Sequence, residues 1–127
     1  MTDTLRILVL DDNVEVAEGV AEILEISGYD VRLVHDGESA VTAFCSGQFD
    51  MGLFDVRMPG KNGVEAYLEI RESFPNAKIA LMSGYAEDSV VQTALDNGAL
   101  GLLCKPFDPE AMLELVAGVE KCNIAAM

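Results

Sequence analysis

The chain has 127 residues, 50% of them hydrophobic, and a formal net charge of −14 from 22 acidic and 8 basic residues. This length suits one domain with a real core, and the acidic excess argues against binding to nucleic acid or anionic lipid. No apolar stretch approaches the roughly 20 residues that cross a bilayer, and Asp11 and Asp12 interrupt the first apolar run too early for a secretory signal. We therefore expect one cytoplasmic domain over residues 1–127, without membrane association.

Short apolar runs that suit buried strands alternate along the chain with amphipathic stretches that suit helices. Gly28 is expected to end the first helix, and Pro75 lies beyond the end of the third. Asp108 is expected to cap the fifth helix, with a proline at the first helical position. The strands are predicted at about 5–10, 30–34, 50–54, 78–82 and 100–103, and the helices at 14–27, 38–46, 64 to before Pro75, 87–96 and from 108.

Five such β–α units predict an α/β fold, a doubly wound parallel sheet of five strands with five helices. In these sheets, ligands bind beyond the carboxyl ends of the strands, where the strand order switches. Polar side chains stand at four of these predicted ends. They are Asp11 and Asp12, Asp55, Ser83, and Lys105.

Three carboxylates brought together at one sheet edge repel one another, which favours a bound cation. Oxygen ligands alone point to a hard ion, and Mg²⁺ is the usual choice where phosphate is handled. Asp55 is then placed to act as a nucleophile that forms an acyl phosphate. Lys105 would supply a compact positive charge and Ser83 a hydroxyl donor to the transferring group.

Four segments together resemble the receiver domains of two-component response regulators, over essentially the whole chain. They are Leu8-Val9-Leu10-Asp11-Asp12-Asn13, Phe54-Asp55-Val56-Arg57-Met58-Pro59-Gly60 with Asn62-Gly63, Met82-Ser83-Gly84-Tyr85, and Gly98-Ala99 leading to Lys105-Pro106-Phe107-Asp108.

The resemblance implies a flavodoxin-like fold and a phosphoryl group on Asp55, donated by a sensor histidine kinase or a histidine phosphotransfer protein. It implies that Asp11, Asp12, Asp55 and the Arg57 backbone carbonyl bind Mg²⁺. It also implies that Ser83 and Lys105 contact the phosphoryl group, and that Pro106 is the family's proline after lysine, often in a cis peptide.

One position departs from the family pattern. Receivers commonly carry Tyr or Phe three residues before the lysine, and here Leu102 occupies that position. We expect Leu102 to pack passively, while the loop Ser83–Ala86 and the fourth helix carry the response; Tyr85 is a candidate substitute for the missing ring. The face formed by the fourth helix, fifth strand and fifth helix is the expected site of partner binding or of a homodimer.

Two other functions stay open. A degenerate receiver would fold and bind partners without phosphorylation. An aspartyl-phosphate phosphatase on a similar fold would typically need an acid two residues after the nucleophile, where this chain has Arg57. We expect no output domain in residues 1–127, so that the chain acts through a partner or belongs to a longer regulator or hybrid kinase.

The remaining reactive side chains fit no metal set. Cys45, Cys104 and Cys122 are an odd number without metal-like spacing, so reduced and mostly packed thiols are expected. The single histidine, His35, is expected in a loop or at the surface.

Overall fold

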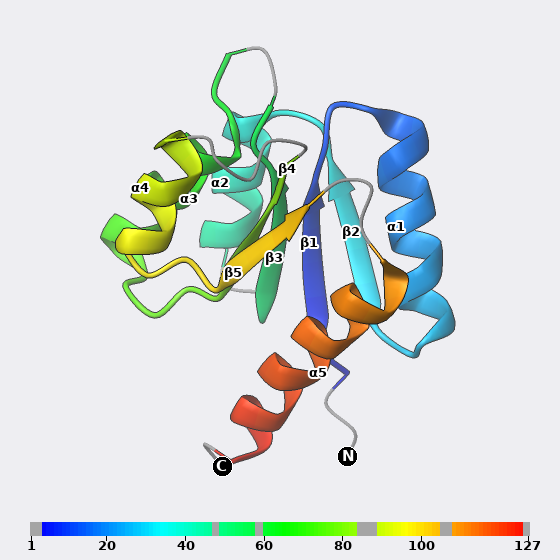
Figure 1. Cartoon of the computed structure of the whole chain (residues 1–127). Helices are drawn as coiled ribbons and strands as arrows, with labels where there is room; N and C mark the ends of the chain where they lie inside the picture. The colour runs from blue at the N-terminus through cyan, green and yellow to red at the C-terminus, as the bar shows by residue number, and fades with distance from the viewer. Residues whose placement is uncertain (1–3, 47–48, 58–59, 84–88, 105–107, 126–127) are drawn as a thin grey trace.

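The structure, a computed structural model, describes residues 4–46, 49–57, 60–83, 89–104 and 108–125, with side chains except at 89–91, 104 and 120–125. Strands and helices alternate in the order that the sequence predicts (Figure 1). The strands are β1 Arg6–Leu10, β2 Asp30–Val34, β3 Met51–Asp55, β4 Ile79–Ser83 and β5 Gly101–Cys104. The helices are α1 Val14–Ile26, α2 Gly37–Cys45, α3 Gly63–Ser73, α4 Ser89–Asp96 and α5 Pro109–Ala125.

The five strands form one parallel sheet in the order β2-β1-β3-β4-β5. The chain steps outward from β1 to β2 and then returns across β1 to β3, so the strand order reverses between β1 and β3. This confirms the predicted doubly wound sheet and places its switch point between the two strands that lead to Asp11 and Asp55.

Helices cover both faces of the sheet, α1 and α5 on one and α2, α3 and α4 on the other (Figure 1). Alternate residues of each strand face opposite layers, so neighbours such as Leu53 and Phe54 belong to different cores. The core under α2, α3 and α4 contains the aromatic side chains of Phe44, Phe54 and Tyr67. The core under α1 and α5 is built from aliphatic side chains and methionine, among them Met51.

The helix ends follow the local signals in the sequence. Asn13 caps α1 by accepting from the Val16 amide at 3.2 Å. After α1, Gly28 adopts a positive φ of 97°, a conformation that glycine reaches without steric cost. At the start of α5, the Asp108 carboxylate accepts from the Glu110 amide at 3.0 Å, as a cap before proline should. The predicted start of the fourth helix at 87 lies outside the described residues.

Three strands, β3, β4 and β5, extend one residue beyond their predicted ends. Asp55 and Ser83 are the last residues of β3 and β4, whereas the sequence pattern ends each strand one residue earlier. The pairing explains the difference, because Asp55 is still in register with Met82, and Ser83 with Cys104. Both polar side chains are therefore held by the ladder itself and not by the loops that follow.

No helix in the described parts of the chain has the length and apolar character needed to span a membrane. Cys45 is a free, half-buried thiol, which agrees with its predicted role in packing. The side chains of Cys104 and Cys122 lie outside the described ones.

Candidate functional site

Three carboxylates meet at the carboxyl edge of the sheet. Asp11 and Asp12 directly follow β1, and Asp55 ends β3 on the neighbouring strand. One carboxylate oxygen from each residue lies within 4.8 Å of the other two. Asp11 and Asp55 are buried, at 0% and 4% exposure, while Asp12 is exposed. The structure thus brings together the acidic residues that the sequence predicts for the metal.

Asp11 is held in place through its backbone and its side chain. Its amide donates to the Val34 carbonyl at 3.2 Å, which ties it to the end of β2. Its carboxylate accepts from the Asn13 amide at 2.9 Å, a short-range turn that aspartate favours. The Asp11 carbonyl is 2.9 Å from Nδ1 of His35. One oxygen of this buried carboxylate is thereby oriented by the start of α1.

Asp55 is held by the strand and by the segment that follows. The Val56 amide donates to the Met82 carbonyl at 3.0 Å, which continues the pairing between β3 and β4 past Asp55. The Arg57 amide donates to the Asp55 carboxylate at 3.3 Å, so the chain turns back over the acid. This turn keeps the Arg57 backbone beside Asp55, where the sequence predicts a carbonyl ligand.

Ser83 ends β4, the strand next to Asp55, and is fully buried. Its position at the same sheet edge agrees with a role beside the acidic cluster. Lys105, the other predicted contact of the phosphoryl group, lies outside the described residues, as do Pro106 and Tyr85. Leu102 lies on β5 and is half-buried against the core under α2, α3 and α4.

The donor set suits a hard divalent cation. Two unit charges 4 Å apart repel by about 1 kcal/mol in water and about 4 kcal/mol at an effective dielectric of 20. A protein that collects three carboxylates within 4.8 Å, two of them buried, gains when a cation offsets this repulsion. Oxygen ligands favour Mg²⁺, Ca²⁺ or Mn²⁺ over softer metals. The cluster can therefore hold a metal ion of this kind.

Two contacts at this edge have no signal in the amino-acid sequence. His35 is exposed and in a loop, as predicted, yet its ring reaches the Asp11 carbonyl. Gly63 lies against the Asp55 backbone: a Cβ added there would be 2.9 Å from the Asp55 carbonyl carbon. Both contacts join segments that are distant in the sequence or bend back sharply, so no local pattern signals them.

A parallel doubly wound sheet with an acidic cluster at its switch point defines the class of protein, and comparison with known families agrees. The chain belongs to the response regulator receiver domain family, whose model matches residues 7–117. It is 34% identical over 110 residues to the response regulator receiver protein Anae109_2439 of Anaeromyxobacter, covering 87% of this chain and 46% of that protein. The chain thus spans about half the length of that relative.

Shorter relatives match over most of their length. The chemotaxis protein CheY of Treponema pallidum is 34% identical over 119 residues, covering 91% of this chain and 83% of that protein. Among solved structures, chemotaxis protein CheY4 of Vibrio cholerae aligns with a TM-score of 0.85 and 28% identity, covering 92% of this chain and 99% of that one. The predicted receiver fold and family are confirmed.

Proposed function

We propose that Asp55 is the phosphoacceptor of this receiver domain and takes its phosphoryl group from a phosphohistidine donor. The supporting observation is the placement of the buried Asp55 carboxylate within 4.8 Å of the oxygens of Asp11 and Asp12 at the switch point of the sheet. In the transfer, an Asp55 oxygen attacks phosphorus, a P–O bond forms and the P–N bond to the donor imidazole breaks. The imidazole nitrogen leaves and takes a proton from solvent.

Asp11, Asp12, Asp55 and the Arg57 carbonyl would hold Mg²⁺. Bound there, the cation supplies positive charge against the oxygens of the transferring group. Asp11 is oriented for this by the Asn13 amide at 2.9 Å, and Asp55 by the Arg57 amide at 3.3 Å. We assign Ser83 and Lys105 to contacts with the phosphoryl group; the burial of Ser83 next to β3 supports the first of these.

The donor would be a sensor histidine kinase or a histidine phosphotransfer protein, and we propose that the chain acts in the cytoplasm with it. The chain would catalyse only its own phosphorylation and dephosphorylation. We take residues 1–127 as a single receiver domain that signals through α4, β5 and α5, a face that can also support a homodimer. The half-buried Leu102, packed against the core under α2, α3 and α4, supports passive packing at this position.

Labelling with acetyl phosphate and Mg²⁺ tests the assignment. Intact mass should show one acid-labile phosphoryl group on the wild-type protein, and Asp55→Asn should abolish it. Asp30→Asn is a matched control, because it changes an exposed carboxylate at the opposite end of the sheet, the amino end of β2. Labelling that persists in Asp55→Asn contradicts the assignment, and a wild-type protein that is never labelled behaves as a degenerate receiver.

A further inference from the structure

Residues 61–63, which lead into α3, have close backbone contacts on two sides. On one side lies Gly37, the buried first residue of α2. A Cβ added at Gly37 would lie 2.7 Å from Cγ and 2.9 Å from the carbonyl carbon of Lys61, and closer still to the Lys61 carbonyl oxygen. Cβ atoms essentially never approach backbone this closely, so any side chain at residue 37 must push the segment away.

The opposite side of the segment rests on β3. A Cβ added at Gly63 would lie 2.9 Å from the Asp55 carbonyl carbon and 3.1 Å from Cβ of Phe54. Neither Gly37 nor Gly63 is among the described glycines with positive φ, which are Gly28, Gly60 and Gly98. Space, and not backbone conformation, therefore requires glycine at both positions. The segment at 61–63 is wedged between α2 and the residue proposed to carry the phosphoryl group.

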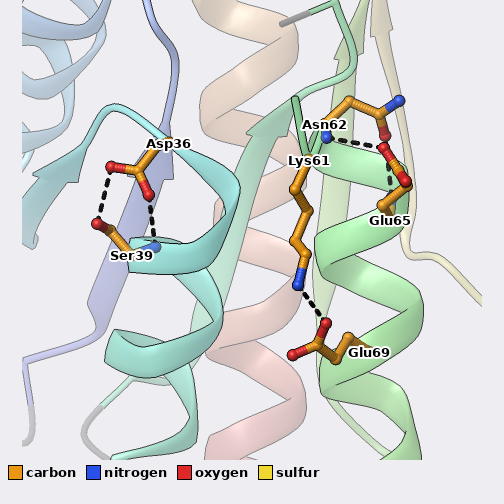
Figure 2. A network of polar contacts seen from close by, with 6 residues as sticks. All are labelled: Asp36, Ser39, Lys61, Asn62, Glu65 and Glu69. Atoms are coloured by element: carbon orange, nitrogen blue, oxygen red, sulfur yellow. Dashed lines mark hydrogen bonds and ion pairs between the residues drawn. The ribbon is translucent and has the colours of Figure 1, made fainter. Parts of the chain in front are cut away.

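Hydrogen bonds fix the starts of both α2 and α3 (Figure 2). At α2, the Asp36 carboxylate accepts from the Ser39 amide at 2.7 Å and from the Ser39 hydroxyl at 2.8 Å. These hydrogen bonds, first that from the Ser39 amide, hold the pKa of Asp36 below its ordinary value. The capped helix start resists displacement, so a push at Gly37 is transmitted to the segment.

At α3, Asn62 and Glu65 form a reciprocal capping box. The Glu65 amide donates to the Asn62 side chain at 2.9 Å, and the Asn62 amide donates to the Glu65 carboxylate at 3.1 Å. Lys61, just before α3, also forms an ion pair with Glu69, which lies one helical turn beyond Glu65, as Figure 2 shows. The segment therefore moves together with the first turns of α3.

We propose that Gly37 is a positioning residue for the metal centre: the start of α2 sets the place of residues 61–63, and through Gly63 that of the Asp55 backbone. The inference rests on the proposed function. The alternative is that Gly37 serves only the packing of α2 against α3. A positioning role predicts that a substitution at Gly37 weakens Mg²⁺ binding, although Gly37 contributes no ligand. A role in packing alone predicts unchanged Mg²⁺ affinity.

Gly37→Ala tests the proposal against Gly19→Ala. Gly19 lies within α1, and a Cβ there would meet nothing within 4 Å. For each protein, calorimetric titration gives the Mg²⁺ affinity and denaturant unfolding without metal gives the stability. We expect Gly37→Ala to weaken Mg²⁺ binding about tenfold or more, the range found when groups that orient metal ligands are changed, and Gly19→Ala to leave it unchanged. Equal affinities in the two variants overturn the proposal.

A measurement on the wild-type protein covers the case in which Gly37→Ala does not fold. Coupling is reciprocal, so Mg²⁺ should slow hydrogen exchange at the Ser39 and Ala40 amides. Both amides bond to Asp36, through its side chain and its carbonyl respectively, and neither belongs to a ligand segment. Unchanged exchange at these amides, in a protein that binds Mg²⁺ and is labelled at Asp55, overturns this inference alone. A wild-type protein that binds no Mg²⁺ overturns the proposed function as well.

Discussion

The two helical layers on the sheet contribute to the acidic edge in different ways. The layer of α2 and α3 reaches it through backbone contacts, of Gly37 with Lys61 and of Gly63 with Asp55. The layer of α1 and α5 contributes charge, because Asp12 precedes α1 and is exposed. Substitutions in the first layer should therefore change the geometry of the site, while a substitution at Asp12 should change mainly its charge.

The cores beneath the two layers also differ in the side chains that build them. In the core under α2, α3 and α4, the Phe54 ring lies edge-on to Phe44 with centroids 6.5 Å apart. The Tyr67 hydroxyl, from α3, donates to the Asn97 carbonyl at 3.1 Å, just after α4. The described buried members of the core under α1 and α5 are aliphatic side chains and methionine. Among the described residues, the buried aromatic side chains therefore lie in the core under α2, α3 and α4.

Phe54→Ala and Leu53→Ala should have the largest effects and compare the two layers directly. Both side chains are fully buried on neighbouring positions of β3, but they face opposite layers. We expect losses in the free energy of unfolding of about 3–5 kcal/mol for Phe54→Ala and about 2–5 kcal/mol for Leu53→Ala.

The two variants should separate in Mg²⁺ affinity, measured by calorimetric titration under conditions where both stay folded. Phe54→Ala should weaken binding, because the ring links β3 to Phe44 of α2, whereas Leu53→Ala should change it little. Equal losses of affinity would mean that the two layers do not differ in their control of the site.

Tyr67→Phe should have a smaller effect. It removes the hydrogen bond to the Asn97 carbonyl and should lower the free energy of unfolding by about 1 kcal/mol. Burial raises the pKa of Tyr67 above its ordinary value of 10.0. The folded state therefore keeps the phenolic proton to a higher pH than the unfolded chain does. The free energy of unfolding should accordingly fall as the pH rises above 10.0.

Denaturant unfolding of the wild-type protein and of Tyr67→Phe, at neutral pH and above pH 10.0, checks both expectations. The variant lacks the titrating phenol, so the difference in free energy of unfolding between the two proteins must change with pH in this range. If this difference in free energy of unfolding is the same at both pH values, burial does not raise the pKa of Tyr67.

Asp36→Ala should have the smallest effect. Its hydrogen bonds from Ser39 lower the pKa of Asp36 below the ordinary value of 3.8. The carboxylate thus stabilises the folded state at neutral pH, and this contribution is lost as the pH falls through the lowered pKa. The free energies of unfolding of the wild-type and variant proteins should differ at neutral pH and become equal in acid. Asp36→Asn, which keeps a capping oxygen, should stay closer to wild type at neutral pH.

The sequence predicts those features that depend on local chemistry. Apolar runs bounded by Gly28 or Pro75 place the elements, and the strand-end positions of Asp11, Asp55 and Ser83 place the site. The approach of Gly37 to Lys61 is not predictable in this way, because it depends on how two helices pack beside the sheet. The ladder also extends β3 and β4 through their polar last residues, which a pattern of apolar residues cannot register.

The most direct test of the metal centre is Mg²⁺ titration of Asp12→Ala, combined with its unfolding in the absence of metal. Removing this carboxylate takes away a ligand and also relieves repulsion among three acids that lie within 4.8 Å of one another. We predict weaker Mg²⁺ binding together with equal or higher metal-free stability than the wild-type protein. Wild-type Mg²⁺ affinity, or a loss of metal-free stability, would contradict the view that these carboxylates are held together to bind a cation.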